Sequence, residues 1–376
     1  MTRKIASHYL SSRKGLIRNV LVEVADDGEI LSLGTAENID SLCGVEFYSG
    51  ILCPGWVNAH CHLELSYLRG AIAEGTGFAG FAREIGRTRG GFTPSQRLAA
   101  AEAADAAMRA EGVAAVGDVA NDALIMPVKA RSGIRYRTFA EAFGLTTDST
   151  DSLGELLRYP SASPTPHSTY SLQDALFRRI CSAGDAPLSI HFLESADEKA
   201  LYSGCGSLAE WYGRMGWQCD FLGYGSPAAR IAACVPPQRQ VLLVHGCFTQ
   251  REDIEMLDRH FDRPPFWVLC PESNRYISRL MPPVDLLREA GCRICLGTDS
   301  PASATTLSMV EQMRLLGDVP LEEMLLWATW NGACALGMED DLGSIEPGKH
   351  PGIVLLEGVD MNAMKIGGDT RARRLV

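Results

Sequence analysis

The sequence lacks any long uninterrupted apolar run: no stretch approaches the ~18 consecutive apolar residues that a membrane-spanning helix needs. It also lacks an excess of basic residues, since 35 Lys and Arg face 46 Asp and Glu, a net charge of −11. Broad binding to nucleic acid or to anionic membranes requires a basic face, so we expect neither partner. The twelve cysteines are too sparse among 376 residues for a disulfide scaffold.

The first residues are partly basic, but no apolar segment of the kind found in a secretory signal follows them. We therefore expect a reducing, cytoplasmic location, in which cysteines within apolar runs act as small hydrophobic side chains. Hydrophobic residues make up 46% of the chain and charged residues 22%. That is enough apolar material for a sizeable core, and the composition is that of a soluble globular enzyme.

Both ends of the chain have the pattern of β structure. Apolar or alternating runs at 20–24 and 29–33 flank Asp26-Asp27-Gly28, which predicts a hairpin turn. Near the other end, a turn-rich segment precedes a strand-like run at 353–356. We expect the two ends to pair into one small β-sandwich domain around a central body, with the boundaries 1–50 plus 341–376 for the sandwich and 51–340 for the body.

The central body alternates short apolar strands with helical patterns, which is typical of an α/β fold with a parallel sheet. Helices are predicted at 95–111, 284–290 and 321–335. Eight strands are predicted, the fourth being Pro-rich: 51–58, 113–119, 134–141, 161–166, 187–192, 240–245, 266–270 and 292–297. Eight such repeats predict a TIM-like (β/α)8 barrel, whose active site lies at the carboxyl ends of the strands. The long segments 67–94 and 195–239 are candidate substrate walls.

Histidines gather at the predicted carboxyl ends of the strands. His60, His62, His191 and His245 lie at or just beyond such an end, and His167 follows the fourth strand. On a barrel these ends share one rim. Side chains two positions apart on a strand point the same way, so His60 and His62 would form half of a metal site.

Carboxylates accompany these histidines. Glu194 follows His191 by three residues, and the last predicted strand runs into Gly297-Thr298-Asp299-Ser300. A His-x-His pair alone is more often a surface or core pair, but several strand ends that carry such residues argue against a purely structural role. Histidine nitrogens with one carboxylate suit zinc or a neighbouring first-row metal.

Taken in order along the chain, these motifs resemble the amidohydrolase superfamily of metal-dependent (β/α)8 hydrolases, and within it the deaminase and chlorohydrolase branch. Within that branch the chain most resembles the 6-aminodeoxyfutalosine and adenosylhomocysteine-type deaminases. The run His62-Leu63-Glu64-Leu65-Ser66 looks more like the former. The stretch 343–349 resembles the return of that branch to its small β-sandwich. The other matching stretches are 54–64, His191-Phe192-Leu193-Glu194, His245-Gly246, Cys270-Pro271-Glu272-Ser273-Asn274 and Gly297-Thr298-Asp299-Ser300.

The resemblance implies one divalent metal ion, zinc first and iron as the alternative, held by His60, His62, His191 and Asp299. His245 would hold the attacking water, Asp299 would accept its proton, and Glu194 would deliver a proton to the substrate. A metal can lower the pKa of a bound water from about 16 to about 7. Binuclear relatives need a bridging lysine on a barrel strand, and the third and fourth predicted strands end without one. We therefore expect a mononuclear site.

Four residues are predicted to contact the substrate. His167 resembles the substrate-contacting histidine on the fourth strand of such deaminases, with a role in satisfying loop carbonyls as the alternative. Glu64 follows the metal pair directly and could equally be a solvated or capping carboxylate. The remaining two are Asn274 and Ser300.

One further pattern needs an interpretation. The residues Gly75-Thr76-Gly77-Phe78-Ala79-Gly80 match a dinucleotide-binding fingerprint, but no strand precedes them, as that fingerprint requires. We interpret this segment as a flexible active-site loop.

The sequence favours hydrolytic deamination of an aminated heterocycle, an aminopurine nucleoside of the 6-aminodeoxyfutalosine or adenosine type, with release of ammonia. The alternative within the branch is displacement of chloride or an alkylamine from an aromatic ring. Glu194 favours deamination, because protonation of a ring nitrogen needs an acid there. A metal-binding protein without catalysis is a third hypothesis, although Glu194 and His245 are not needed merely to hold a metal. We expect a small heterocyclic amine as the partner, and the sequence leaves monomer and homodimer open.

Overall fold

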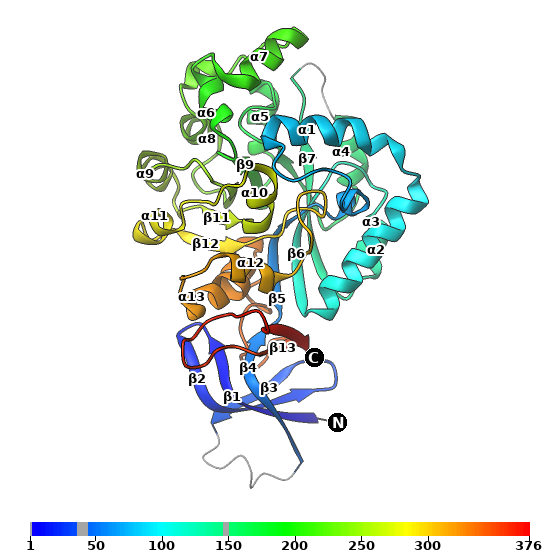
Figure 1. The fold of residues 1–376 in the computed structure, drawn as a ribbon, viewed down its shortest axis with the longest axis vertical. Coiled ribbons are helices and arrows are strands. Elements are labelled where there is room, and N and C mark those ends of the chain that lie inside the picture. The colour runs from blue at the N-terminus through cyan, green and yellow to red at the C-terminus, as the bar shows by residue number, and fades with distance from the viewer. Residues whose placement is uncertain (1, 36–43, 146–149) are drawn as a thin grey trace.

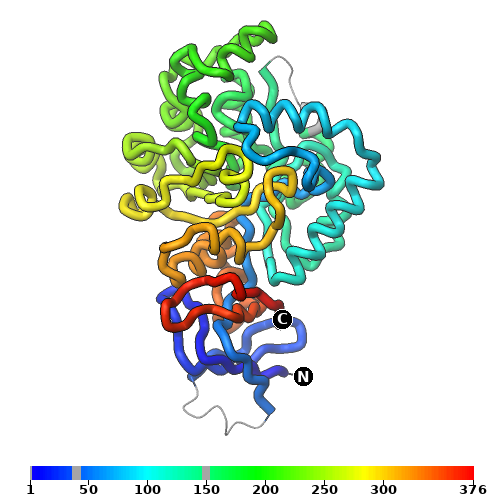
Figure 2. Tube along the Cα trace, in the orientation of Figure 1, coloured from blue at the N-terminus to red at the C-terminus, as the bar shows by residue number. Residues whose placement is uncertain are grey.

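Both ends of the chain enter one sheet in the computed structural model, which describes residues 2–35, 44–145 and 150–376 (Figure 1). The order of its six strands is β14-β13-β4-β1-β2-β3. Figure 2 shows the blue amino-terminal and red carboxy-terminal segments side by side. The strands are β1 (Thr2–Ser12), β2 (Gly15–Ala25), β3 (Ile30–Thr35), β4 (Val45–Pro54), β13 (Ile353–Glu357) and β14 (Arg371–Arg374).

Alternation of apolar residues gives this terminal sheet a core of its own. Val20, Val22 and Val24 on β2 are fully buried in a cluster that also holds Ile5 of β1. β3 returns antiparallel to β2, which confirms the predicted hairpin. Gly28 in that turn has a left-handed φ of +96°, a conformation that a side chain would oppose.

The central strands form two four-stranded parallel sheets, in the orders β5-β6-β7-β8 and β12-β11-β10-β9. Single parallel bridges join the two sheets at both seams, Cys61 with Asp299 and Ser168 with His191. The arrangement is a TIM-barrel-like α/β fold. The strand bounds are β5 (Trp56–Cys61), β6 (Val113–Ala120), β7 (Arg135–Ala142), β8 (Ala162–Pro166), β9 (Leu188–Phe192), β10 (Val241–His245), β11 (Phe266–Leu269) and β12 (Arg293–Leu296).

Seven of the eight predicted central strands agree with these bounds within a residue or two, the Pro-rich fourth included. The prediction of one strand at 51–58 is wrong. Residues 51–54 belong to β4, where they pair with β13 of the terminal sheet, and β5 begins at Trp56. Gly55 lies between the two strands. The position requires glycine, because a Cβ there would clash with the carbonyl oxygen of Pro351 and the side chain of Ala114.

Helices cover the central sheets, and among the described residues none is both long and apolar enough to cross a membrane (Figure 1). The predicted helices at 95–111, 284–290 and 321–335 are confirmed, the last with a π-helical turn at Trp327–Asn331. The bounds are α1 (Gly77–Thr88), α2 (Pro94–Ala110), α3 (Met126–Arg131), α4 (Thr150–Leu156), α5 (Asp174–Cys181), α6 (Ala196–Tyr202), α7 (Gly206–Met215), α8 (Pro227–Cys234), α9 (Arg251–His260), α10 (Pro271–Ser278), α11 (Val284–Glu289), α12 (Met309–Leu315), α13 (Leu321–Leu326) and α14 (Gly332–Leu336).

The interpretation of residues 75–80 as a flexible active-site loop is wrong from Gly77 onward, because α1 begins there, although Phe78 of this segment does line the cavity described below. Phe78, Phe81 and Ile85 recur at helical spacing, a signal that the glycines of this segment obscured. The segment 195–239 likewise holds three helices, α6, α7 and α8.

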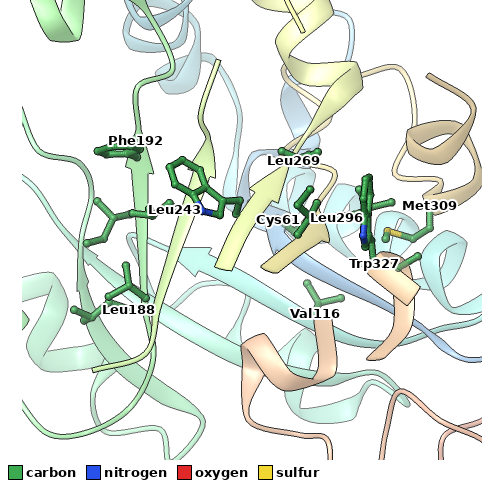
Figure 3. Close-up of a cluster of buried hydrophobic side chains, with 14 of the residues drawn as sticks. Cys61, Val116, Leu188, Phe192, Leu243, Leu269, Leu296, Met309 and Trp327 are labelled. Atoms are coloured by element: carbon green, nitrogen blue, oxygen red, sulfur yellow. The ribbon is translucent and has the colours of Figure 1, made fainter. Parts of the chain in front are cut away.

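The main apolar core lies between the central strands and the helices that cover them. Figure 3 shows Leu188 and Phe192 of β9 near Leu243 of β10, and Leu296 of β12 near Trp327. These side chains are almost fully buried. Apolar packing against the helices therefore holds the strands in place, and the polar side chains lie at the carboxyl ends of the strands.

Candidate active site

Two of the predicted site residues stand on strained backbone where a strand ends. His245 has φ +76° and Asp299 has φ +56°, and Leu193, beside Glu194, has φ +49°. Residues other than glycine rarely adopt this left-handed region, and such strain gathers at functional sites. Leu193 directly follows β9, His245 is the last residue of β10, and Asp299 lies three residues beyond β12. Glu194, His245 and Asp299 all line the cavity described below.

The imidazoles of β5 and β9 meet with their ring nitrogens facing one another. His62 Nε2 lies 3.2 Å from His191 Nε2, and the buried His60 Nε2 has no hydrogen-bond partner within the described part of the chain. His191 Nδ1 lies 2.8 Å from the backbone carbonyl oxygen of His167 and donates to it. That hydrogen bond leaves the Nε2 lone pair of His191 available to a metal ion.

Asp299 completes the cluster from the seam between β5 and β12, across the site from the seam that carries His191. Its Oδ2 accepts hydrogen bonds from Ser273 Oγ at 2.6 Å and Ser303 Oγ at 2.9 Å. Its Oδ1 is turned to the histidines and lies 3.7 Å from His62 Nε2. Buried nitrogen lone pairs that face a carboxylate oxygen are a donor set for a divalent cation. The residues present thus fit a single divalent metal ion. Three overlapping triads could hold it: His60, His62 and Asp299; His60, His191 and His245; or Glu141, His167 and His191.

His245 differs from the other imidazoles in its partner. Asn274 Nδ2 lies 3.0 Å from His245 Nδ1. With the amide as donor, Nδ1 accepts and the proton of the ring resides on Nε2. That Nε2 lies 3.9 Å from Glu194 Oε1. His245 therefore presents a hydrogen-bond donor to the site, whereas a metal ligand must present a lone pair.

Burial sets the protonation of these groups. It lowers the pKa of all five imidazoles, to about 4 for His191 and about 3 for His167, so they are neutral at pH 7. Burial raises the pKa of the Glu194 carboxyl well above its usual value, and the nearby Asp299 and Glu198 raise it further. A carboxyl group with a raised pKa is a proton donor at neutral pH.

These groups form the floor of a cavity of about 440 Å³. Of the residues predicted to contact the substrate, His167, Glu64 and Ser300 line it. Asn274 is not among the lining residues and lies behind His245. His62, His191, Glu194, His245 and Asp299 also line the cavity.

Asn121 and Glu141 are among the polar cavity residues that escaped the sequence analysis. Asn121 donates its backbone N–H to Glu64 Oε2 at 2.8 Å and its side-chain amide to Glu141 Oε2 at 2.9 Å. Both follow or end a predicted strand, β6 or β7, and that position was the signal that could have found them. Burial raises the pKa of Glu64 to about 8 despite the Asn121 hydrogen bond.

A family comparison matches this site and fold. The amidohydrolase family model matches residues 51–374. The chain belongs to the amidohydrolase family. Among curated proteins, this amidohydrolase is 25% identical over 366 residues to the 5-methylthioadenosine/S-adenosylhomocysteine deaminase of Halobacterium salinarum, covering 90% of this chain and 80% of the relative.

Solved structures of similar fold include a deaminase and a chlorohydrolase. The aminofutalosine deaminase of Helicobacter pylori, in complex with methylthio-coformycin, has a TM-score of 0.81 at 24% identity, covering 94% of this chain and 92% of its own. The zinc complex of atrazine chlorohydrolase from Arthrobacter aurescens has a TM-score of 0.77 at 18% identity, covering 99% and 95%. Because both identities are below 25%, these structural similarities establish the fold of this amidohydrolase and nothing about its substrate.

Proposed function

We propose that this amidohydrolase is a mononuclear metal-dependent aminohydrolase that deaminates an aminopurine nucleoside of the adenosine type. The metal ligands in this proposal are the four predicted ones, His60, His62, His191 and Asp299. His191 supports it because its Nδ1 proton is already donated to a carbonyl. His245 is left out of the ligand set because Asn274 occupies its Nδ1 and directs its Nε2 proton into the site.

A divalent ion held by those residues, zinc in the favoured version, would supply Lewis acidity that makes water nucleophilic at neutral pH. The chain supplies the remaining groups. Asp299, fixed by Ser273 and Ser303, accepts the proton of the attacking water. His245 Nε2 donates a hydrogen bond to the oxygen of the attacking water as the tetrahedral centre forms on the substrate carbon. Glu194 gives its proton to the ring nitrogen beside the carbon that bears the amine. Asp299 then passes the proton it took from the water to that amine, which leaves as ammonia. The remaining hydroxyl proton is lost as the carbonyl forms and restores the proton of Glu194.

The observation that carries the proposal is the buried Glu194 carboxyl beside His245. Only 8% of Glu194 is exposed, and burial holds its pKa well above the usual range. Protonation of a ring nitrogen needs an acid that keeps its proton at neutral pH, which this group satisfies. The names of the relatives point to the same class, since the curated relative is a deaminase of adenosine derivatives.

We extend the proposal to architecture and location. The bridges at both seams support closure of the eight strands into one barrel. The separate apolar cluster of the terminal sheet supports the predicted small sandwich of 1–50 plus 341–376, with its border to the barrel moved to Gly55. The described cysteines are free thiols, in keeping with a cytoplasmic location.

Ammonia release from metal-replete protein tests the function. The panel holds adenosine, 5′-methylthioadenosine, cytosine, guanine and a chlorinated aminotriazine, and metal content is measured on the same sample. We expect ammonia from the adenosines, with close to one metal equivalent per chain. Chloride release from the triazine without deamination of any nucleoside would contradict the proposal in favour of the chlorohydrolase alternative, and two metal equivalents would contradict the mononuclear site.

A further inference from the structure

A second buried carboxyl group, Glu198, lies behind the candidate proton donor and takes no direct part in the chemistry described above. It is on α6, four residues after Glu194, and it is 0% exposed. It is not among the residues that line the cavity. A buried carboxyl group costs free energy unless polar partners replace the water that it has lost. The partners of Glu198 therefore indicate what it does.

One oxygen of Glu198 is tied to a fixed point of the loop after β8. Its Oε1 accepts a hydrogen bond from Thr169 Oγ1 at 2.5 Å. The carbonyl oxygen of Thr169 accepts two more hydrogen bonds, from Tyr202 Oη and Arg230 Nη1, both at 2.7 Å. Arg230 is fully buried, with its guanidinium packed against two phenylalanine rings. Three side chains thus hold Thr169 in place, and it can serve as an anchor.

The other side of Glu198 faces the turn that carries Glu194. Burial raises the pKa of the Glu198 carboxyl to about 8, and the backbone N–H groups of Leu193 and Glu194 are among the donors that oppose this rise. Among the described residues no backbone carbonyl accepts these two N–H groups, and Glu198 Oε2 is buried with no other donor within hydrogen-bond distance. Because buried backbone N–H groups are almost always paired, Glu198 is the acceptor available to both.

The turn needs such support. Leu193 has a left-handed φ of +49°, a conformation that persists only where the surrounding structure holds it. No hydrogen bond to the Glu194 carboxyl is present among the described residues, and His245 Nε2 lies 3.9 Å from its Oε1. The position of the acid therefore depends on the backbone that carries it.

An ordinary helix cap would not act on this turn. Asp253 is the third residue of α9, as Glu198 is the third residue of α6. Asp253 accepts the backbone N–H of Gln250, the residue directly before its own helix, at 2.9 Å. Glu198 instead reaches past Ser195, the residue directly before α6, to the N–H groups of the preceding turn.

We propose that Glu198 is a positioning residue that fixes the backbone of Glu194, and with it the proton donor, by tying the turn after β9 to Thr169. The inference rests on the proposed function, because that function makes Glu194 the acid. Glu198 does not reach the cavity, so it acts through Glu194. Without the tie the acid is displaced from the ring nitrogen, and a displacement of about 1 Å can cost about 10²-fold in rate.

Glu198→Met tests this role, because methionine fills a similar space and accepts no backbone hydrogen bond. With rates expressed per bound metal, we expect kcat to fall about 10- to 100-fold, KM to stay within about three-fold, and metal content to be unchanged. Glu198→Gln should recover most of the loss, since its amide oxygen can accept the N–H groups while its amide nitrogen donates to the Thr169 hydroxyl. If Glu198→Met does not fold, Thr169→Val carries the test, because it removes only the anchoring hydroxyl, with an expected fall of about 3- to 10-fold in kcat.

Asp253→Leu is the matched control. It removes a buried carboxyl group from the same position of α9, where the carboxyl caps its own helix and does not act on the turn of Glu194. We expect kcat per bound metal to stay within about two-fold. A fall as large as that of Glu198→Met would overturn the inference, because any loss of a buried cap would then have the same effect.

A double-variant cycle separates positioning from a general structural role. If Glu198 acts only through Glu194, then Glu198→Met added to Glu194→Gln should lower kcat by no more than about two-fold further. A residue that merely supports the fold would multiply the two losses. Multiplied losses would therefore overturn the inference.

Hydrogen exchange separates this inference from the proposed function, because it needs no turnover. In Glu198→Met the amides of Leu193 and Glu194 should exchange at least about five- to ten-fold faster, whereas those of β9 should stay protected. Faster exchange in a protein that deaminates no nucleoside would support the tie and refute the proposed function alone. Deamination that is lost in Glu194→Gln, with unchanged exchange and turnover in Glu198→Met, would refute the positioning role alone.

Discussion

At the scale of single residues, the site depends on which nitrogen of each imidazole carries the proton. The carbonyl oxygen of His167 takes the Nδ1 proton of His191, whereas Asn274 donates to Nδ1 of His245. His191 therefore presents a nitrogen lone pair to the cavity, whereas His245 presents an N–H donor. The same logic makes Glu194 an acid, because burial opposes its ionisation.

Glu194→Gln should keep the fold and the metal while kcat falls by about 10²–10⁴-fold, with KM much less affected. Glutamine matches the shape of glutamate but has no proton to give to a ring nitrogen. The measurement is steady-state deamination together with metal content, with and without excess zinc. If Glu194 served only to orient His191, the variant would lose metal instead, and zinc would restore turnover. Near-normal turnover after zinc addition would remove the proton-donor role.

At the scale of elements, the metal-site strand is held by a buried ion pair that the sequence analysis missed. Asp118 of β6 and Lys129 of α3 are in contact with side chains 0% and 3% exposed. Asp118 Oδ1 also accepts the backbone N–H of Leu63 at 2.7 Å, directly after His62. Lys129 donates to Thr138 Oγ1 of β7 at 3.1 Å. One carboxylate thus links β6, α3 and the turn that follows β5.

Lys129→Met should destabilise the fold by about 3–5 kcal/mol, because it leaves the Asp118 carboxylate buried without its counter-charge. The double variant Asp118→Asn with Lys129→Met should recover a large part of that loss, since the asparagine can keep the Leu63 hydrogen bond without a buried charge. Urea unfolding of the wild type, both single variants and the double variant measures the coupling. A loss below about 1 kcal/mol in Lys129→Met would show that the pair is not a buried charge pair in solution.

The sequence was sufficient for the strand ends but not for what packs behind them. Apolar runs followed by His or Asp mark a carboxyl end whatever the tertiary context, so His60, His191 and Asp299 could be found from pattern alone. The join at Gly55 could not, because the apolar run 51–58 reads as one strand until its partners are known. Asn274 and Asp118 act through neighbours distant in the chain, 29 residues away for His245 and 55 for Leu63, and no local pattern shows such contacts.

At the scale of the whole molecule, the candidate metal ligands come from both four-stranded sheets. His60 and His62 lie at the end of β5 in one sheet, and His191 and Asp299 lie at the ends of β9 and β12 in the other. Hydrogen bonds already cross both seams beside the single bridges. The backbone N–H groups of Thr298 and Asp299 donate to the carbonyl oxygen of His60, and that of His191 donates to the carbonyl oxygen of His167. A metal ion held by these residues would therefore cross-link the two parallel sheets at their carboxyl ends.

Removal of the metal should loosen the seams before it affects the terminal sheet. Ligand binding at 100 times Kd stabilises the folded state by about 2.7 kcal/mol, which corresponds to a fall in Tm of about 3 °C on chelation for a chain of this length. Hydrogen exchange should rise in β5, β9 and β12, whose ends carry the ligands. The terminal sheet, with its own apolar cluster, is the internal control, and its exchange should change little. Re-addition of one equivalent of zinc should restore both Tm and protection. An unchanged Tm, or exchange that rises equally in β1 and β5, would contradict a metal that bridges the two sheets, because only a cross-link at the rim confines the effect of chelation to the seams.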